Sequence, residues 1–430
     1  MTIPRRAAFI LTFSILVSLT AIYIASPIKT PADSRWSIHT AMSLIEGHGG
    51  DLSDYMLVLK NNDFYAIEYP GGRPHTMFPI GVSVLVAPIV AAIAAVDPSF
   101  KEMLRHGVPD NLEKVLASIC GATAAATFFW IVFGQFQSLT ISLVMTALFA
   151  FATSMWSTAT RSLWQHGPLV LMFVIVMLLL QRAKLRPALV QYVSLPLAMA
   201  YVVRPTAAIP VVVVTIYVAV FYRRWLIRYI GWALLIAVPW LAYNEAIYGA
   251  LFSPYYLGLS YGVGGDLVFL ESFFGQLISP ARGLLVYSPV FLLAFTGFAL
   301  SLRIPGDRAL HLAYGAVVAG ILLSQGLLAS WWAGHSFGPR YTTDIVPFLA
   351  YFTAFSLQLP PSFGRPTRAV AWSGTVALAA VSIVIHAQGA LRTSPNLWNA
   401  IPNNIDQHPE RLWDWTDPQF MRTKASSPKL

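Results

Sequence analysis

Residues 7–25 read AAFILTFSILVSLTAIYIA, a run without a charged side chain. A helix of about 20 apolar residues crosses the ~30 Å hydrocarbon core of a bilayer, so this run predicts a membrane-spanning helix. The chain holds about twelve such runs, most of them 16 to 22 residues long. Apolar and polar residues do not alternate within them, which excludes a lipid-facing β-barrel. The runs cover residues 7–25, 78–96, 113–133, 139–156, 167–181, 188–203, 206–221, 229–247, 283–301, 309–330, 343–359 and 369–387.

The composition indicates the same class. Of the 430 residues, 56% are hydrophobic and 11% are charged, about half the charge of an ordinary soluble protein. We therefore expect an all-α polytopic protein, integral to the plasma (inner) membrane. A lone cysteine, Cys120, excludes a disulfide framework and a thiolate metal site. The net charge of +9 does not indicate nucleic acid as a partner, because the basic residues form short clusters between the apolar runs.

These basic clusters predict the topology, because short cytoplasmic loops are enriched in lysine and arginine. From the second cluster onward, two apolar runs separate each cluster from the next. Five runs separate the first two clusters, so one of the five must not span. We assign this role to 78–96, because Pro79 and Pro88 interrupt it. About 11 spans then remain, with a cytoplasmic N-terminus. The clusters are Arg5 and Arg6; Arg182, Lys184 and Arg186; Arg223, Arg224 and Arg228; Arg303 and Arg308; and Arg365 and Arg368.

This topology divides the chain into a transmembrane module, residues 1–387, and an extracytoplasmic tail, residues 388–430. The first extracytoplasmic loop covers residues 26–112. The unusual polar residues gather on the extracytoplasmic face, which predicts a site at the outer membrane surface. The tail is either a lid over this site or a surface extension.

The first loop opens with DSRWSIHTAMSLIEGHGGD, residues 33–51. From Ser34 onward, the spacing predicts a short amphipathic helix on the outer leaflet, with one apolar and one polar face. Asp33 precedes this helix, so it is expected to cap it, to act in chemistry, or both. The apolar face is Ile38, Ala41, Met42 and Ile45, and the polar face is Arg35, His39, Ser43 and Glu46.

Five stretches carry a resemblance to a known family: DSRW (33–36), EYPGGRPHTMFPIGVSVLVAP (68–88), SLWQHGP (162–168), SPARGLLVYSP (279–289) and WWAGHSFGPRY (331–341). Together they resemble integral-membrane glycosyltransferases of the GT-C superfamily. The nearest in style are bacterial relatives of the protein O-mannosyltransferases and the lipid A aminoarabinose transferases. The resemblance covers about residues 1–345, and its most specific parts are the acidic first loop and the GPRY segment.

The resemblance implies a GT-C-like bundle with juxtamembrane helices in the first loop. It also implies an enzyme that moves a sugar, with inversion, from a polyprenyl-phosphate donor to a lipid, glycan or protein acceptor on the extracytoplasmic face. By motif position, Asp33 inherits the role of general base. Relatives often carry a second acid near the first. Here no acid adjoins Asp33, and the choice between Glu46 and Glu68 stays open.

The residue types fit this chemistry. A phosphate leaving group departs without a proton, so one carboxylate suffices to accept the proton of the acceptor. Departure of the phosphate requires positive charge in a dry setting. Each candidate also has a structural alternative: arginines that reach the headgroups, tryptophans in an interfacial belt, histidines in loops. The phosphate-binding candidates are Arg282 and Arg340, then Arg204, Arg161 and His75; the substrate-binding candidates are Trp331, Trp332, His335 and His166.

No cofactor is assigned. A divalent cation held by His39, Glu46 and His48 is left open, although their spacing matches no recognised helical zinc motif. Two other functional classes remain as alternatives: a transporter or lipid flippase, and an O-antigen polymerase or ligase. A transporter typically has two related halves with polar groups near the membrane midplane. The expected partners are the donor, the acceptor and membrane lipids.

Overall fold

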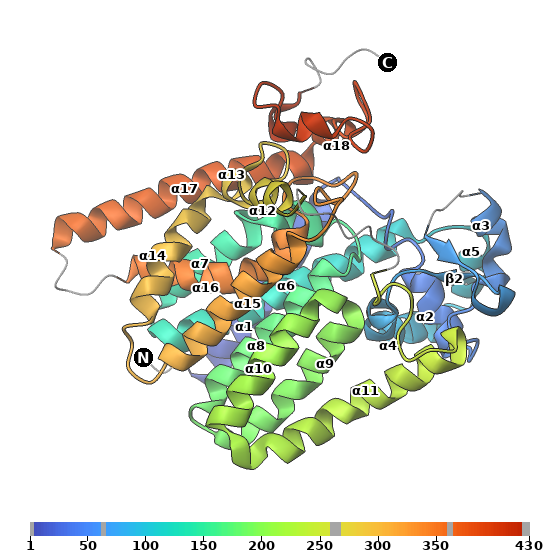
Figure 1. Cartoon of the computed structure of the whole chain (residues 1–430), viewed down its shortest axis with the longest axis horizontal. Coiled ribbons are helices and arrows are strands. Elements are labelled where there is room, and N and C mark those ends of the chain that lie inside the picture. The colour runs from blue at the N-terminus through green and yellow to red at the C-terminus, as the bar shows by residue number, and fades with distance from the viewer. Residues whose placement is uncertain (1–3, 62–65, 259–267, 359–363, 424–430) are drawn as a thin grey trace.

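The computed structural model describes residues 4–61, 66–258, 268–358 and 364–423 (Figure 1). These residues form an all-α protein. Their one small sheet is an antiparallel pair, β1 (Ile67–Glu68) and β2 (His75–Thr76), with Ile67 opposite Thr76. The apolar runs of the sequence recur as helices, in part broken into shorter pieces.

The helices, in chain order, are α1 (Arg5–Ala25), α2 (Ser37–Ile45), α3 (Met56–Asn61), α4 (Gly81–Val96), α5 (Ser99–His106), α6 (Asp110–Phe136), α7 (Leu139–Phe151), α8 (His166–Ala183), α9 (Ser194–Val203), α10 (Ala208–Phe221), α11 (Leu226–Tyr248), α12 (Val268–Ile278), α13 (Leu284–Tyr287), α14 (Leu292–Ser301), α15 (Arg308–Gln325), α16 (Val346–Leu357), α17 (Arg365–Leu391) and α18 (Ser394–Leu397). Short helical turns link them: η1 (Ser53–Tyr55), η2 (Pro70–Gly72), η3 (Met155–Ala159), η4 (Pro187–Val193), η5 (Pro205–Ala207), η6 (Arg223–Trp225), η7 (Pro289–Phe291), η8 (Tyr341–Ile345), η9 (Pro409–Trp413) and η10 (Gln419–Met421).

Among the described residues, 5 helices are long and apolar enough to cross a membrane: α1, α6, α8, α11 with η6, and α17. Helices α4 and α5 make a sixth span only if they are taken as one, and they meet at an angle of 116°. Several shorter apolar helices accompany them, including Pro187–Val203, Pro205–Phe221 and Pro289–Ser301. The helices therefore suit a membrane protein, while the total of about 11 spans stays a prediction.

Successive connections between the long helices lie alternately at the two ends of the helical bundle. The connections α7–α8, α9–α10 and α15–α16 all line one cavity. At the other end, Asp307 before α15 accepts hydrogen bonds from Lys184 after α8, at 2.6 Å, and from Gln135 of α6, at 3.1 Å. The tail with α18 lies over one side of the bundle in Figure 1, and the first-loop elements α2 to α5 lie at another edge.

The predicted break at Pro88 is wrong. Helix α4 continues through Pro88, and the chain turns only between Val96 and Ser99. A proline removes one backbone donor and kinks a helix without always ending it. Gly81 lets the start of α4 approach α9 closely, because a methyl group there would lie 2.5 Å from the Val202 carbonyl oxygen.

The short helix predicted after Ser34 is confirmed as α2, but the expectation that its polar face is exposed is wrong. Helix α2 begins at Ser37 with Trp36 in the cap position, so Asp33 is not its N-cap. Its polar face is covered by protein: His39 Nε2 lies 3.2 Å from the Leu104 carbonyl, and Ser43 donates to the Asp51 carbonyl at 2.8 Å. Because loops of the same chain satisfy both polar groups, both faces of α2 are buried.

Helices α14 and α16 cross in close contact at Gly297. A methyl group at this position would overlap the Phe352 carbonyl oxygen. We expect Gly297→Ala to destabilise the protein by about 1–3 kcal/mol, as overpacked cores do. Gly374 of α17, with no atom of the described chain within 4 Å of such a methyl group, is the matched control. Its change to alanine should be neutral or stabilise by up to ~1 kcal/mol. Thermal unfolding in detergent measures both, and equal midpoints would contradict the crossing.

Candidate active site

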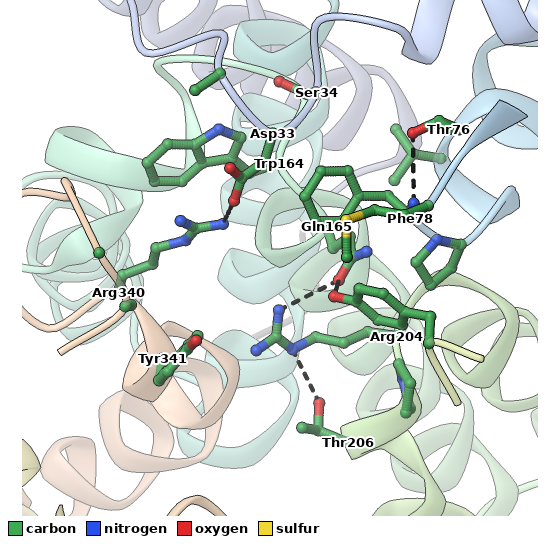
Figure 2. Close-up of a pocket in the computed structure, with 18 of the residues that line it drawn as sticks. Asp33, Ser34, Thr76, Phe78, Trp164, Gln165, Arg204, Thr206, Arg340 and Tyr341 are labelled. Carbon is green, nitrogen blue, oxygen red and sulfur yellow. Dashed lines mark hydrogen bonds and ion pairs between the residues drawn. The ribbon is translucent and has the colours of Figure 1, made fainter. Parts of the chain in front are cut away.

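A cavity of about 970 Å³ lies where the alternate connections meet (Figure 2). Its walls come from residues 32–37, 76–83, 163–165, 204–206, 255–258, 328–341 and 404–406, in segments that are far apart in the sequence. Phe78, Pro79, Val82 and Tyr256 give it an apolar side. Its charged residues are Asp33, Arg204, Arg340 and Asp406, with His335 as a further titratable group.

Asp33 and Arg340 form an ion pair on the cavity wall. The Arg340 Nη2 group donates to Asp33 Oδ2, and the two side chains are 13% and 15% exposed. Figure 2 shows the guanidinium pointing at the carboxylate beside Trp164, whose ring centre lies 3.8 Å from Arg340 Cζ. Burial lowers the pKa of Arg340, but the Asp33 carboxylate and Tyr341 together raise it above its usual value. Arg340 is therefore a permanent cation held in place by a carboxylate and an indole face.

A second ion pair lies behind the first. Arg204 Nε is 3.1 Å from Asp344 Oδ2, and the two side chains are 8% and 0% exposed. His166 connects the two pairs. Its Nδ1 lies 2.6 Å from Asp344 Oδ1, and its Nε2 lies 3.4 Å from nitrogens of both Arg204 and Arg340. Because arginine only donates, Nε2 accepts and Nδ1 carries the proton, so His166 is a neutral imidazole in this arrangement.

Local sequence places both arginines. Arg204 ends α9 in an extended conformation, with φ −157° and ψ 130°, as expected for a residue that precedes a proline, here Pro205. Arg340 lies two residues after Gly338, which has a φ of +60° and packs on Tyr287. A methyl group at Gly338 would lie 2.6 Å from the Tyr287 ring, so the GPRY turn depends on glycine there.

Glu113, in the first turn of α6, joins the two loops beside the Asp33–Arg340 pair. Its Oε1 accepts a hydrogen bond from the Ser34 hydroxyl and another, at 3.2 Å, from the Leu163 backbone N–H. Asp33 and Trp164, the neighbours of these two residues, are thereby held on the same side of the cavity. Sequence reasoning missed Glu113, because a carboxylate at the start of an apolar run gives no sign of its partner.

Gln165 adds an amide to the cavity wall. Its Oε1 accepts from Tyr255 Oη at 3.2 Å and from Arg204 Nη1 at 3.3 Å. Its Nε2 has no hydrogen-bond partner within the described residues, although the side chain is only 8% exposed. Buried donors are normally satisfied, so this group indicates an acceptor atom supplied by a ligand or by water. Its one signal in the sequence is that Gln165 stands within the SLWQHGP stretch, residues 162–168.

Arg282 and Arg161, both predicted to bind phosphate, do not line the cavity. Arg282 is buried and donates to the carbonyls of Trp332 at 2.8 Å and Gly334 at 3.1 Å, and to the side chains of Asn399 and Gln419, both at 2.7 Å. Burial lowers its pKa to about 10. Arg161 is likewise buried and donates to the carbonyls of Ser26 and Tyr23, at 3.1 and 3.0 Å.

The two candidates for a second acid also lie elsewhere. Glu46 caps α2 and accepts from Lys101 at 2.8 Å. Glu68 borders a separate pocket of about 350 Å³ next to Tyr248, and burial raises its pKa. Neither lines the cavity with Asp33. The second acid of the site is Asp344, which sequence reasoning missed. It lies behind the cavity and pairs with Arg204.

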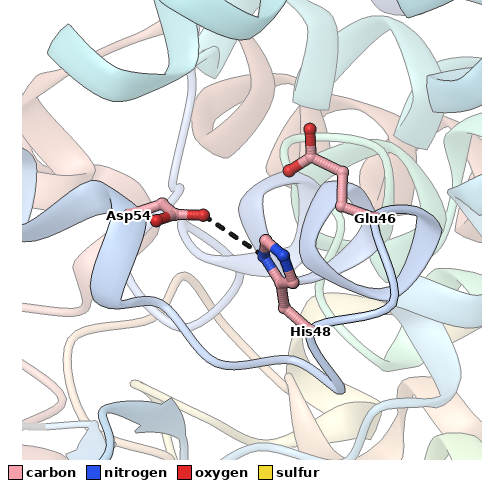
Figure 3. A group of neighbouring side chains, drawn as sticks. All are labelled: Glu46, His48 and Asp54. Carbon is pink, nitrogen blue, oxygen red and sulfur yellow. Dashed lines mark ion pairs between the residues drawn. The ribbon is translucent and has the colours of Figure 1, made fainter.

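The predicted cation site is only partly assembled. Glu46 and His48 come together with Asp54, with ligand atoms within 4.8 Å of one another (Figure 3). His39 is not among them, because it is buried against Leu104 and Gly107. The Lys101 ammonium already neutralises Glu46, which opposes binding of a cation. This cluster is exposed and lies away from the cavity.

Of the aromatic and histidine candidates, some line the cavity and others are buried elsewhere in the protein. His335 lines the cavity. His166 is buried behind it, and Trp331 belongs to a separate apolar core. Trp332 is half-buried and donates to Asp406 at 2.7 Å. His75 is buried next to the cavity residue Thr76, with Nδ1 3.0 Å from the Arg73 carbonyl. The tail packs on the loop of residues 331–340 and contributes Asn404 and Asp406 to the cavity.

Comparison with protein-family models and with curated proteins finds no match to this chain. The geometry of the cavity is therefore the basis of any functional proposal.

Removal of Arg282 should destabilise the protein rather than weaken ligand binding. Arg282→Ala leaves buried acceptors on Trp332, Gly334, Asn399 and Gln419 without this donor, and each unpaired group costs about 1–3 kcal/mol. We expect a loss of at least ~2 kcal/mol, measured as a lower thermal midpoint in detergent together with faster proteolysis of the tail. The exposed Arg392 is the control, and Arg392→Ala should leave both unchanged. An unchanged midpoint in Arg282→Ala would show that Arg282 has no structural role.

Proposed function

We propose that the protein is an integral-membrane glycosyltransferase of the GT-C type, which moves a sugar from a polyprenyl-phosphate donor to an acceptor hydroxyl. The observation that carries this proposal is the placement of Asp33, Arg340 and Arg204 on one cavity with an apolar side. A displacement at a sugar carbon with a phosphate leaving group requires a base for the acceptor proton and positive charge for the phosphate. A carboxylate next to two guanidinium groups supplies both.

The residues divide the reaction between them. The acceptor hydroxyl attacks the anomeric carbon and gives its proton to Asp33, while the bond from that carbon to the phosphate oxygen breaks. The electron pair leaves with the phosphate, whose added charge is stabilised by Arg340 and Arg204, with Gln165 Nε2 as a further donor. A single displacement inverts the configuration at carbon. The apolar side of the cavity, with Phe78 and Val82, suits the isoprenoid chain.

We further propose about 11 spans and an extracytoplasmic cavity. Helices α1, α6 to α11 and α14 to α17 each join the cavity end to the opposite end of the bundle, and this alternation supports the count. The clusters of lysine and arginine between the apolar runs lie at the end of the bundle away from the cavity. By the positive-inside rule that end faces the cytoplasm, which places the cavity outside. The gathering of charged groups at one end also argues against a transporter, whose site would lie near the midplane.

The sidedness is tested with single cysteines in a Cys120→Ala background. Leu185→Cys reports the basic end, and Asn403→Cys reports the tail; both positions are exposed. A membrane-impermeant maleimide applied to intact cells should label Asn403→Cys and not Leu185→Cys. After permeabilisation both should react, which serves as the control for accessibility. Labelling of Leu185→Cys in intact cells would place the cavity on the cytoplasmic side.

The chemistry is tested with farnesyl phosphate, a short polyprenyl phosphate, and with sugars linked to it. Arg340→Ala and Arg204→Ala should each weaken binding of farnesyl phosphate by about tenfold to a hundredfold, the value of a hydrogen bond to a charged group. Asp33→Asn should bind at least as tightly, because it removes a competing carboxylate. It should lose transfer to a cell-envelope extract by about a hundredfold or more, as expected without a general base.

Arg182→Ala is the matched control for these variants, because Arg182 is an exposed arginine at the opposite end of α8. It should bind farnesyl phosphate and transfer sugar as the wild type does. Full transfer by a normally folded Asp33→Asn would remove the assignment of the base. Unchanged binding by both arginine variants would remove the phosphate site.

A further inference from the structure

The polar residues that line the cavity fall into two sets of contacts. Arg204 contacts Gln165, and Arg340 contacts Trp164. The loop of residues 328–335 and the tail contribute a second set, whose polar side chains are Ser330, His335, Asn404 and Asp406. This second set has no lysine or arginine among the described lining residues. A phosphate is therefore attracted to the first set, and the second set suits a neutral polar group.

His335, Asn404 and Asp406 form a connected set, which we name the polar rim. His335 Nε2 lies 3.0 Å from Asn404 Oδ1 and 3.4 Å from Asp406 Oδ2. Asn404 Oδ1 also accepts from the Asp406 backbone N–H at 2.9 Å. The side chains of His335 and Asp406 are 44% and 49% exposed, so the rim still offers donors and acceptors to a ligand.

The rim is held rigidly on the fold. Ile405, between its two tail residues, is fully buried in an apolar cluster with Trp331, Trp398 and Leu412. The Trp332 indole N–H fixes Asp406 at 2.7 Å. Arg282 then joins the tail to the loop of residues 331–340 through Asn399 and the Gly334 carbonyl. The tail is therefore an ordered part of the cavity wall. A ligand can bind to it with little reordering of the side chains.

We propose that the polar rim binds the acceptor, and that the acceptor is a carbohydrate with several free hydroxyl groups; this rests on the proposed function. A hydroxyl both donates and accepts, and the rim supplies partners of both kinds: an amide, a carboxylate and an imidazole. A sugar ring presents several hydroxyls within the span of these groups. A peptide presents its backbone N–H and C=O groups in alternating directions along an extended chain, so fewer of them face a compact set of partners at once.

The proposal assigns acceptor choice to the tail. Asp33 and the rim line the same cavity, so a sugar held by the rim has its hydroxyls inside the chamber that contains the base. Donor binding depends on the arginines, and acceptor binding depends on residues 335, 404 and 406. The two kinds of binding are separable by mutation.

The test measures binding of the full-length protein, in lipid nanodiscs, to an array of oligosaccharides and serine- and threonine-containing peptides. Wild type should bind oligosaccharides. Asp406→Ala and Asn404→Ala should each weaken this binding by about tenfold, the effect of one lost hydrogen bond to a ligand. Arg182→Ala, an exposed position at the opposite end of α8, should bind the oligosaccharides as the wild type does.

Glu410→Ala is the matched control. Glu410 is another exposed tail carboxylate paired with a histidine, His408 Nδ1 at 3.0 Å, but it does not line the cavity. Unchanged thermal midpoints and unchanged binding of farnesyl phosphate exclude misfolding of the rim variants. Preference for peptides, no binding by wild type, or full oligosaccharide binding by both rim variants would each overturn the proposal. Because this test needs no donor, the polyprenyl-phosphate proposal can fail while the rim proposal stands.

Discussion

The arrangement of this protein depends on one electrostatic constraint: the charges of Asp33 and Arg340, both mostly buried, must neutralise each other. The two residues come from opposite parts of the chain, and neither charge is tolerated in an enclosed, partly apolar cavity without the other. Each surrounding contact serves this pairing. Glu113 holds the loops of Asp33 and Trp164 together, Trp164 covers one face of the guanidinium, and Gly338 allows the turn that presents it. The first loop and the last third of the chain are thereby fixed against each other at the cavity end of the bundle.

The four arginines that the sequence suggested for phosphate binding differ in what neutralises or satisfies them, and this difference separates a structural role from a chemical one. Arg161 and Arg282 are buried away from the cavity and donate to backbone carbonyls and to neutral side chains. Arg204 and Arg340 are paired with carboxylates and face the cavity. An arginine satisfied by neutral acceptors contributes rigidity, whereas one paired with an acid at a cavity wall can exchange its partner for an anion.

The sequence predicted the helices well, because apolar runs of membrane length have few alternatives. It also singled out Asp33 and Arg340 from distinctive short motifs, and the fold brings the two together at one cavity. It failed where the answer depends on long-range partners. Pro88 does not end α4, His39 and Ser43 are buried by loops of the same chain, and Arg282 meets tail residues more than 100 positions later. Asp344 and Glu113 went unnoticed for the same reason: their roles come from segments that pattern reading cannot place beside them.

The pairing of acids with arginines also decides how such a cavity can hold a phosphate. The site contains two neutral pairs, Asp33 with Arg340 and Asp344 with Arg204, joined by a neutral His166. No uncompensated charge has to be buried, so the site can form before any ligand arrives. Under the proposed function, an entering phosphate would bring its own negative charge and compete with Asp33 for the donors of Arg340. Asp344 is fully buried behind Arg204 and keeps its pair. Of the two carboxylates, Asp33 is therefore the one that an anionic ligand releases, and it is also the one exposed to the cavity where an acceptor would enter.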